Sequence, residues 1–170
     1  MLIDFENLNM QNTTSVCGLL SNCVNAVTLH LDHMNTSSIT VACAMFYNCP
    51  NLKQINLGDF NKNILNNMQS MFGGCTKLEY VNLKGFDTSK VETTCCMFID
   101  CHSLRTLDLS NFVVSHLKPR SLSAMFSRCT SLETIYLPLE AKSRQRIVQS
   151  LRNSFVHHCT GIYGNRKINI

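Results

Sequence analysis

Ten cysteines among 170 residues carry most of the chemical potential of this sequence. In a secreted protein so many cysteines suggest disulfides, and thiols that converge with histidines suggest a zinc site. A free cysteine is also a small, frequently buried side chain with a weak S–H donor. Six of the ten recur at one position of a repeated segment: Cys23, Cys49, Cys75, Cys101, Cys129 and Cys159. We interpret this cysteine column as a packing position whose S–H groups serve turn carbonyls.

The other cysteines leave alternatives open. Cys17, Cys43 and Cys95 form a second column, six residues before the first. Reduced thiols are the expectation for a chain without a targeting segment, although a bridge between neighbouring repeats is sterically conceivable. Cys96 lies outside both columns, beside Cys95. This vicinal pair is either a redox or metal-responsive site or two small residues at the surface.

The sequence offers little else for catalysis or metal binding. His30 and His33 flank Asp32, and residues 157–159 read His-His-Cys. Neither group supplies the four converging ligands of a zinc site, so we predict no metal and no cofactor. Nucleophile signatures, a phosphate-binding glycine loop and paired catalytic carboxylates are also missing. The sequence therefore does not predict an enzyme.

A repeat of about 26 residues must position these side chains. The pair Met-Phe begins at residues 45, 71, 97 and 125, and each copy continues with the column cysteine, a leucine and an apolar–polar–apolar triplet. The triplet predicts a short strand with one buried face. Leu65, Met68 and Phe72 lie at i, i+3 and i+7, which predicts a short helix before each cysteine. Such units bury their apolar faces only by stacking on one another, so the pattern indicates a solenoid.

The unit at residues 71–91, MFGGCTKLEYVNLKGFDTSKV, resembles the 26-residue repeat of BspA-like bacterial surface proteins, M-F-x-x-C-x-x-L-x-x-L-D-L-S-x-F-D-T-S-x-V. Residues 104–112, LRTLDLSNF, match the strand half of that pattern. The resemblance covers nearly the whole chain and implies leucine-rich-repeat architecture, surface display, adhesion and protein–protein contact. The predicted fold class is α/β: a leucine-rich-repeat solenoid of about six 26-residue strand–turn–helix units with a parallel sheet on one face.

We expect residues 1–170 to form a single solenoid domain, with an atypical C-terminal repeat at residues 139–170 that contains a basic amphipathic helix. Residues 118–170 hold 9 Lys and Arg against 2 Asp and Glu. The helix either closes the repeat array or docks an acidic partner. Nucleic acid is not expected as a partner. Binding of nucleic acid is a weaker alternative, and the basic helix is the only feature that supports it.

The strand face is the predicted binding surface. One row holds the outward residues of the triplets, and a second row runs two residues upstream. The first row is Asp4, His30, Asn56, Asn82, Asp108 and Tyr136, and the second is Thr28, Gln54, Tyr80, Thr106 and Thr134. Tyrosine and asparagine make serviceable contact residues because they combine contact area with hydrogen bonding.

The location and the ends of the chain lead to further expectations. No run approaches the roughly 18 consecutive apolar residues of a membrane span. Asp4 and Glu6 stand where a signal peptide would be positively charged, so we expect a cytoplasmic protein or one exported by another route. The resemblance suggests the cell surface instead. Strand copies run from Ile3 to Ile170 and leave little sequence for polar caps, so the chain is either a segment of a longer array or self-associates end to end.

The predicted function is a non-enzymatic protein–protein interaction module, an adhesion or host-interaction protein whose partner is another protein. The alternative, from a different class, is a cysteine-based redox or metal-binding protein that uses Cys95 and Cys96.

Overall fold

The computed structural model describes residues 10–31, 34, 36–57, 60, 65–83, 85–156 and 158–170. Short strands recur at the predicted triplets, and their bounds are β1 Thr28–His30, β2 Gln54–Asn56, β3 Tyr80–Val81, β4 Thr106–Asp108 and β5 Thr134–Tyr136. The apolar residue that follows the first residue of each strand is buried, as alternation along a strand requires. The repeat period therefore locates the strands correctly.

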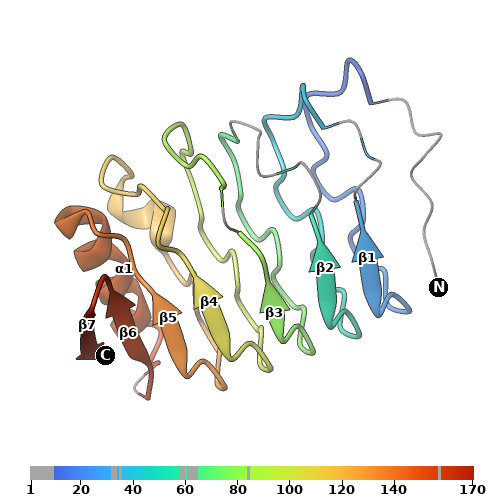
Figure 1. Ribbon diagram of the computed structural model, residues 1–170. Helices are drawn as coiled ribbons and strands as arrows, with labels where there is room; N and C mark the ends of the chain where they lie inside the picture. The colour runs from blue at the N-terminus through green and yellow to red at the C-terminus, as the bar shows by residue number, and fades with distance from the viewer. Residues whose placement is uncertain are drawn as a thin grey trace.

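The strands form two separate sheets. β1, β2 and β3 pair in parallel, with Thr28 opposite Gln54 and Gln54 opposite Tyr80. β4 pairs in parallel with β5, and β5 pairs in parallel with β6 (Thr160–Tyr163). β7 (Arg166–Asn169) is antiparallel to β6. Figure 1 shows β1 to β6 side by side along one side of the molecule, in chain order. Successive repeats thus stack as neighbours, and their strands share one face.

The segments expected to be short helices are series of turns. Within residues 70–75 the backbone N–H groups donate alternately: Ser70, Phe72 and Gly74 donate to the following repeat at 2.8 to 3.0 Å. The intervening residues donate to carbonyls three residues earlier in their own repeat. Positive φ angles recur twice per repeat, as at Ser70 (53°) and Gly74 (76°). A left-handed residue cannot continue a right-handed helix, so the backbone is satisfied across repeats instead of along a helix.

The predicted leucine-rich-repeat solenoid of about six strand–turn–helix units with one parallel sheet is therefore wrong. The described residues contain one α-helix, α1 (Ala141–Asn153), and among their turns lies the 3-10 helix η2 (Pro119–Leu122). They form a three-stranded and a four-stranded sheet, and the last strand runs antiparallel. The error arose because apolar residues at i, i+3 and i+7 also suit successive tight turns that point the same residues inward.

The repeated Met-Phe pairs form the core. The phenylalanine rings stack on one another from repeat to repeat, with centroids 5.5 Å apart for Phe46 and Phe72, 5.6 Å for Phe72 and Phe98, and 6.2 Å for Phe98 and Phe126. The methionines beside them are fully buried. Because each ring packs on the ring of the next repeat, the core runs continuously through the stack.

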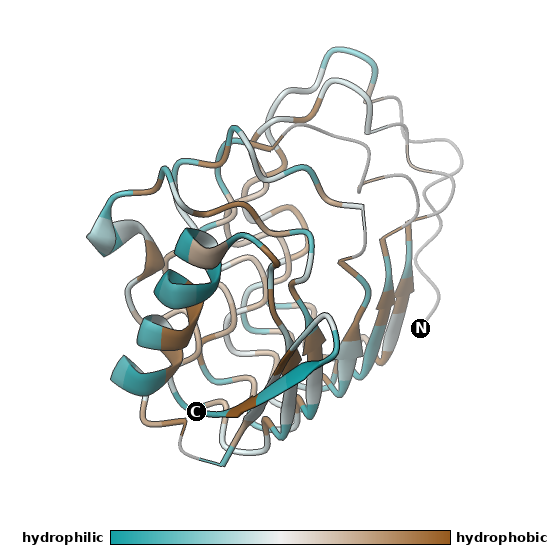
Figure 2. Ribbon diagram, turned by 60° about the vertical axis from the view of Figure 1, so that its left-hand side comes forward, coloured by the Kyte–Doolittle hydropathy of each residue, from teal (hydrophilic) through white to brown (hydrophobic). Residues whose placement is uncertain are grey.

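The basic amphipathic helix predicted after Pro138 is confirmed as α1. Its buried face consists of Ser143, Ile147, Ser150 and Leu151. Phe155 lies beyond the last helical residue and is 81% exposed. Figure 2 shows hydrophilic residues dominating α1 and β7, with short hydrophobic stretches within the helix. α1 and the β6–β7 hairpin thus lie at the C-terminal end of the stack (Figure 1).

Candidate functional site

The predicted binding residues lie on the strands and share one face within each sheet. In the first sheet Thr28, Gln54 and Tyr80 are opposite one another, and His30 is opposite Asn56. In the second sheet Thr106 is opposite Thr134, and Asp108 is opposite Tyr136. Asn82 is exposed just after the end of β3, and Asp4 lies outside the described residues. The structure therefore brings the predicted residues together as two groups, one on each sheet.

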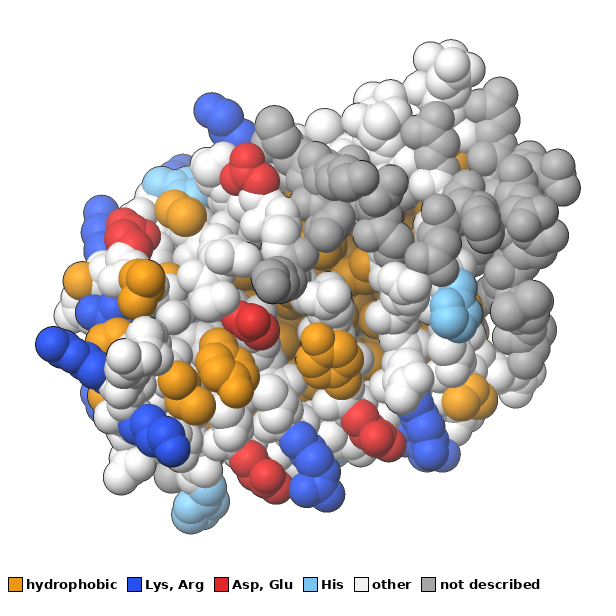
Figure 3. Space-filling model, in the orientation of Figure 1, with side chains coloured by type: hydrophobic (Ala, Val, Ile, Leu, Met, Phe, Trp, Pro, Cys, Tyr) orange, Lys and Arg blue, Asp and Glu red, His pale blue; other side chains and the backbone are white. Residues whose placement is uncertain are grey.

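The two tyrosines are the largest exposed side chains of these rows. Tyr80 is 52% exposed and Tyr136 is 41% exposed. The strand residue after Tyr80 and the strand residue before Tyr136 are instead buried in the core. Figure 3 shows hydrophobic side chains scattered among polar ones on this side of the molecule. Asp108 accepts a hydrogen bond from the Ser110 backbone N–H at 2.9 Å, which orients its carboxylate. The face offers aromatic area surrounded by hydrogen-bonding groups, the composition typical of protein-contact surfaces.

Sequence reasoning missed a charged row at one edge of this face. The exposed residues immediately before β2, β3, β4 and β5 alternate in sign: Lys53, Glu79, Arg105 and Glu133. The last two form an ion pair at 3.0 Å. Blue and red side chains alternate along the lower edge of the molecule in Figure 3. The sequence contains this signal, because the four residues occupy one column of the repeat.

The cysteine column has the predicted packing role in its central members. The thiols of Cys49, Cys75, Cys101 and Cys129 donate to carbonyls of the preceding repeat at 3.1 to 3.2 Å. Three of these carbonyls belong to Phe46, Phe72 and Phe98. Burial raises the pKa of Cys129 to about 12 and that of Cys159 to about 11. Because the thiolate is the nucleophile and the metal ligand, Cys129 and Cys159 are poor candidates for chemistry, whereas the hydrogen bond with Cys75 lowers the pKa of Cys49 to about 7.

The second column contains a disulfide. Cys17 and Cys43 are bridged, 26 residues apart in sequence, with their Cα atoms 4.6 Å apart. The expectation of reduced thiols is therefore wrong for this pair. The reason is geometric, since stacked repeats bring equivalent residues within the Cα separation that a disulfide needs. The bridge connects two successive repeats on their turn segments rather than on the strands.

Cys95 and Cys96 form a thiol pair at the surface. Their Sγ atoms are 3.5 Å apart and both side chains are half-buried. Cys96 adopts a left-handed φ of 57°. Burial, followed by the hydrogen bond with Cys95, raises the pKa of Cys96 to about 11. The pair is close enough for two-thiol chemistry, and the Cys96 thiol is protonated at neutral pH.

The described histidines and the basic helix contribute no cluster of ligands, and His33 and His157 lie outside the described residues. The structure places no group of three or more His, Cys, Asp or Glu so as to hold a metal ion, within the residues that it describes. On α1, Arg144 stacks over the Tyr163 ring at 4.1 Å and donates to the carbonyl oxygens of Pro138 and Leu139. One basic side chain of the helix therefore fastens it to β6 and to the preceding turn. This role had no signal in the sequence, because it depends on how α1 meets β6.

No helix in the described part of the chain is long and apolar enough to cross a membrane. No curated protein and no protein of known structure gives a significant match to this chain. Residues 8–137, which contain all the regular repeats with β1 to β5, match a family described as "Mycoplasma protein of unknown function, DUF285". The match covers well over half of the 170 residues. The chain therefore belongs to this family of Mycoplasma proteins of unknown function, DUF285.

Proposed function

We propose that the protein is a non-enzymatic protein–protein interaction module that binds its partner through the strand face. The observation that carries the proposal is the placement of Tyr80 and Tyr136, both exposed, on β3 and β5 of this face, one in each sheet. Exposed tyrosines contribute strongly to protein contacts because they bury a large area and lose little side-chain entropy. Strands stacked at a fixed spacing hold these side chains in a preformed arrangement, which lowers the entropic cost of binding.

The resemblance of the repeat to BspA-like surface proteins supports a more specific form of this proposal. Proteins of that kind are displayed on bacterial surfaces, where they adhere to other proteins. On that basis the partner is a protein exposed on a host or neighbouring cell. Membership of the DUF285 family supports no particular activity, because the function of that family is unknown. Support for adhesion therefore comes from the strand face and from the repeat pattern.

Matched tyrosine variants test the proposal. Three immobilised chains are exposed to a detergent extract of host-cell surface proteins: wild type, the double variant Tyr80→Ala/Tyr136→Ala and the control Tyr47→Ala. Tyr47 is 45% exposed, comparable to the other two, but lies on a turn segment away from the strands. We expect proteins that wild type and the control retain to be depleted at least about tenfold on the double variant, since one hot-spot tyrosine contributes about 2 kcal/mol. Equal retention by all three chains contradicts binding through this face.

A second function is favoured by one observation, the 3.5 Å separation of the Cys95 and Cys96 Sγ atoms. Two thiols at this distance suit a dithiol that chelates a trivalent arsenical, a reaction in which two S–H protons leave with the oxide oxygen as water. They equally suit oxidation to a disulfide by a disulfide oxidant, which is reduced to two thiols. This alternative makes the protein a cysteine-based redox or metal-binding protein.

Thiol labelling separates the two functions. If the cysteines serve packing, native protein exposed to an aromatic disulfide reagent at pH 7 labels slowly, and denatured protein exposes all eight free thiols. A functional dithiol instead gives two thiols that react in the native state, and the fast phase disappears in Cys95→Ser/Cys96→Ser. Native labelling that is fast at Cys95 and Cys96 therefore supports the alternative. Uniformly slow labelling of native protein excludes it.

A further inference from the structure

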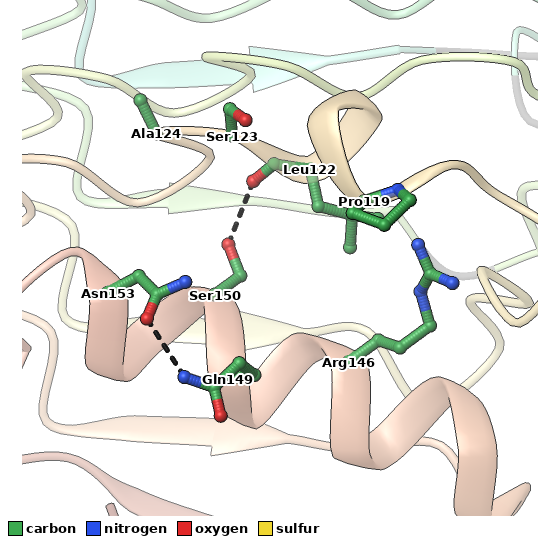
Figure 4. A pocket seen from close by; sticks show the side chains of 8 residues that line it. All are labelled: Pro119, Leu122, Ser123, Ala124, Arg146, Gln149, Ser150 and Asn153. Atoms are coloured by element: carbon green, nitrogen blue, oxygen red, sulfur yellow. Dashed lines mark hydrogen bonds between the residues drawn. The ribbon is translucent and has the colours of Figure 1, made fainter.

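A cavity of about 390 Å³ lies between η2 and α1, at the place where the stack of regular repeats ends. Its lining comes from η2, from the turn that follows it and from α1, and includes no strand residue. Figure 4 shows α1 along one side of the cavity, and η2 with the following turn along the other. The cavity is therefore separate from the strand face, and a ligand bound there would be independent of the proposed partner.

One wall of the cavity carries a backbone donor that has lost its usual acceptor. At this position of each earlier repeat, the N–H group donates to the following repeat: Gly18 to Cys43, Ala44 to Gln69, Ser70 to Cys95 and Cys96 to Ser123, at 2.8 to 3.0 Å. Ala124 is the next member of this series, and α1 follows it in place of another repeat of turns. Within the described residues no hydrogen bond from the Ala124 N–H is found.

The direction of this N–H follows from the peptide plane. The Ser123 carbonyl accepts a hydrogen bond from Cys96 of the preceding repeat, so it points back into the stack. In a trans peptide the N–H and C=O groups point in opposite directions, and the structure has no cis peptide among the residues it describes. The Ala124 N–H therefore points away from the stack, toward α1 and the cavity that Ala124 lines.

The opposite wall carries a guanidinium that also lacks a partner. The Arg146 Nε atom is buried and makes no hydrogen bond within the described residues. No carboxylate lines the cavity, and the ion pairs of the described residues do not include Arg146. A buried donor of a charged group is costly to leave unsatisfied. An anion in the cavity would remove this cost.

The Asn153 side chain also presents a donor. Gln149 Nε2 donates to Asn153 Oδ1 at 2.9 Å, an interaction drawn in Figure 4. This bond occupies the oxygen of Asn153 and leaves its amide N–H₂ group available as a donor. Pro119 and Leu122 add apolar surface between the two ends of the cavity (Figure 4). Ala124, Arg146 and Asn153 thus each present a donor to the cavity, and Pro119 and Leu122 lie between them.

We propose that this cavity binds a small organic anion, with its acidic group on Arg146, its apolar body against Pro119 and Leu122, and an acceptor oxygen near Ala124 and Asn153. The chemistry shared by the candidate ligands is a carboxylate or phosphate joined to a short apolar chain. Arginine suits both groups because its planar donors match their oxygens in pairs. A neutral molecule of the same shape would leave the guanidinium unsatisfied.

Three probes of one length test the proposal on the full chain by NMR titration: hexanoate, hexyl phosphate and 1-hexanol. We expect at least one anion to shift the Ala124 amide and the Arg146 Nε–H resonances, with an affinity at least tenfold above that of hexanol. Binding by hexanoate alone identifies a carboxylate ligand, and binding by hexyl phosphate alone identifies a phosphate ligand. Equal binding of hexanol, or binding of neither anion, overturns the proposal.

Two variants and a control locate the site. Arg146→Gln removes the charge, and Asn153→Asp places a like charge at the other end of the cavity with almost no change of shape. Each is expected to weaken anion binding at least tenfold. Arg152→Gln, on an exposed position of the same helix, is expected to change it less than twofold. Circular dichroism confirms that each variant is folded. If Arg146→Gln fails to fold, the anion affinity of Asn153→Asp alone tests the site. An unchanged anion affinity in the folded variants contradicts the proposed site.

Discussion

The central cysteines each meet two requirements with one side chain. Their thiols fill a fully buried position, and their S–H groups donate to carbonyls of the preceding repeat, as Cys101 does to Phe72 at 3.2 Å. Serine at this position could donate but would leave a smaller, more polar group in the core. Alanine would leave a void and an unsatisfied carbonyl. The recurrence of cysteine therefore follows from packing and hydrogen bonding together.

Burial of the Cys129 thiol predicts a loss of stability at alkaline pH. The folded-state pKa of Cys129 is about 12, above the value of 9.0 for an exposed thiol. Below pH 9 the thiol is protonated in both states and the stabilisation is complete. Above pH 9 the thiol ionises only in the unfolded chain, so the free energy of unfolding falls by up to about 1.4 kcal/mol per pH unit until pH approaches 12.

Urea denaturation at intervals from pH 7 to pH 11 measures this effect. The comparison is with Cys129→Ser, whose hydroxyl does not ionise in this range and whose stability should fall less steeply above pH 9. Lysine and tyrosine titration affects both proteins equally and cancels in the difference. Parallel pH profiles for the two proteins would show that burial of this thiol does not control its ionisation.

At the scale of the elements, the turn segments depend on left-handed residues that are not glycine. Ala44, Ser70, Cys96 and Ala124 occupy one such position with φ between 51° and 57°, and Gly18 occupies it in the first described repeat with φ of 67°. A left-handed conformation costs an L-residue about 1–2 kcal/mol. The hydrogen bonds to the following repeat offset this cost, because the N–H of each of these residues except Ala124 makes one.

This cost predicts that Ala44→Gly stabilises the protein. Glycine adopts a φ of 51° without steric strain but loses more backbone entropy on folding, so the expected net gain is about 0.5–1 kcal/mol. The control Ala42→Gly, at a fully buried position outside the left-handed series, should lower stability. Thermal denaturation of both variants provides the measurement. A loss of stability in Ala44→Gly would mean that its backbone is not strained.

The strands could be predicted from the sequence, and the turn segments could not. The triplet centred on Ile55 alternates with a period of two, and its register follows from the repeat because equivalent residues pair. Leu65, Met68 and Phe72 point inward in either a helix or a series of turns, so their spacing does not distinguish the two. The decisive residues are Ser70 and its equivalents in the other repeats, because their residue types do not indicate a left-handed φ. The predicted helix after Pro138 was correct because its apolar and basic faces persist over several turns.

At the scale of the whole molecule, the repeats and the C-terminal elements present different surfaces. Aligned strands carry the tyrosine-containing face, whose neighbouring charges alternate in sign. α1 interrupts the series of turns, and the cavity beside it exists only because a helix stands where another repeat would be. The strand-face residues could be predicted because they repeat. The cavity could not, because it depends on the junction between two kinds of element.

The central claim is that the strand face binds a protein, and the dissociation constant of the complex tests it most directly. The partner is the protein that wild type retains and Tyr80→Ala/Tyr136→Ala does not, and its affinity for the three full-length chains is measured by titration calorimetry. We predict that the double substitution raises the Kd at least tenfold and that Tyr47→Ala changes it less than twofold. A Kd that is unchanged in the double variant but raised in Tyr47→Ala would place binding on the turn segments and contradict the claim.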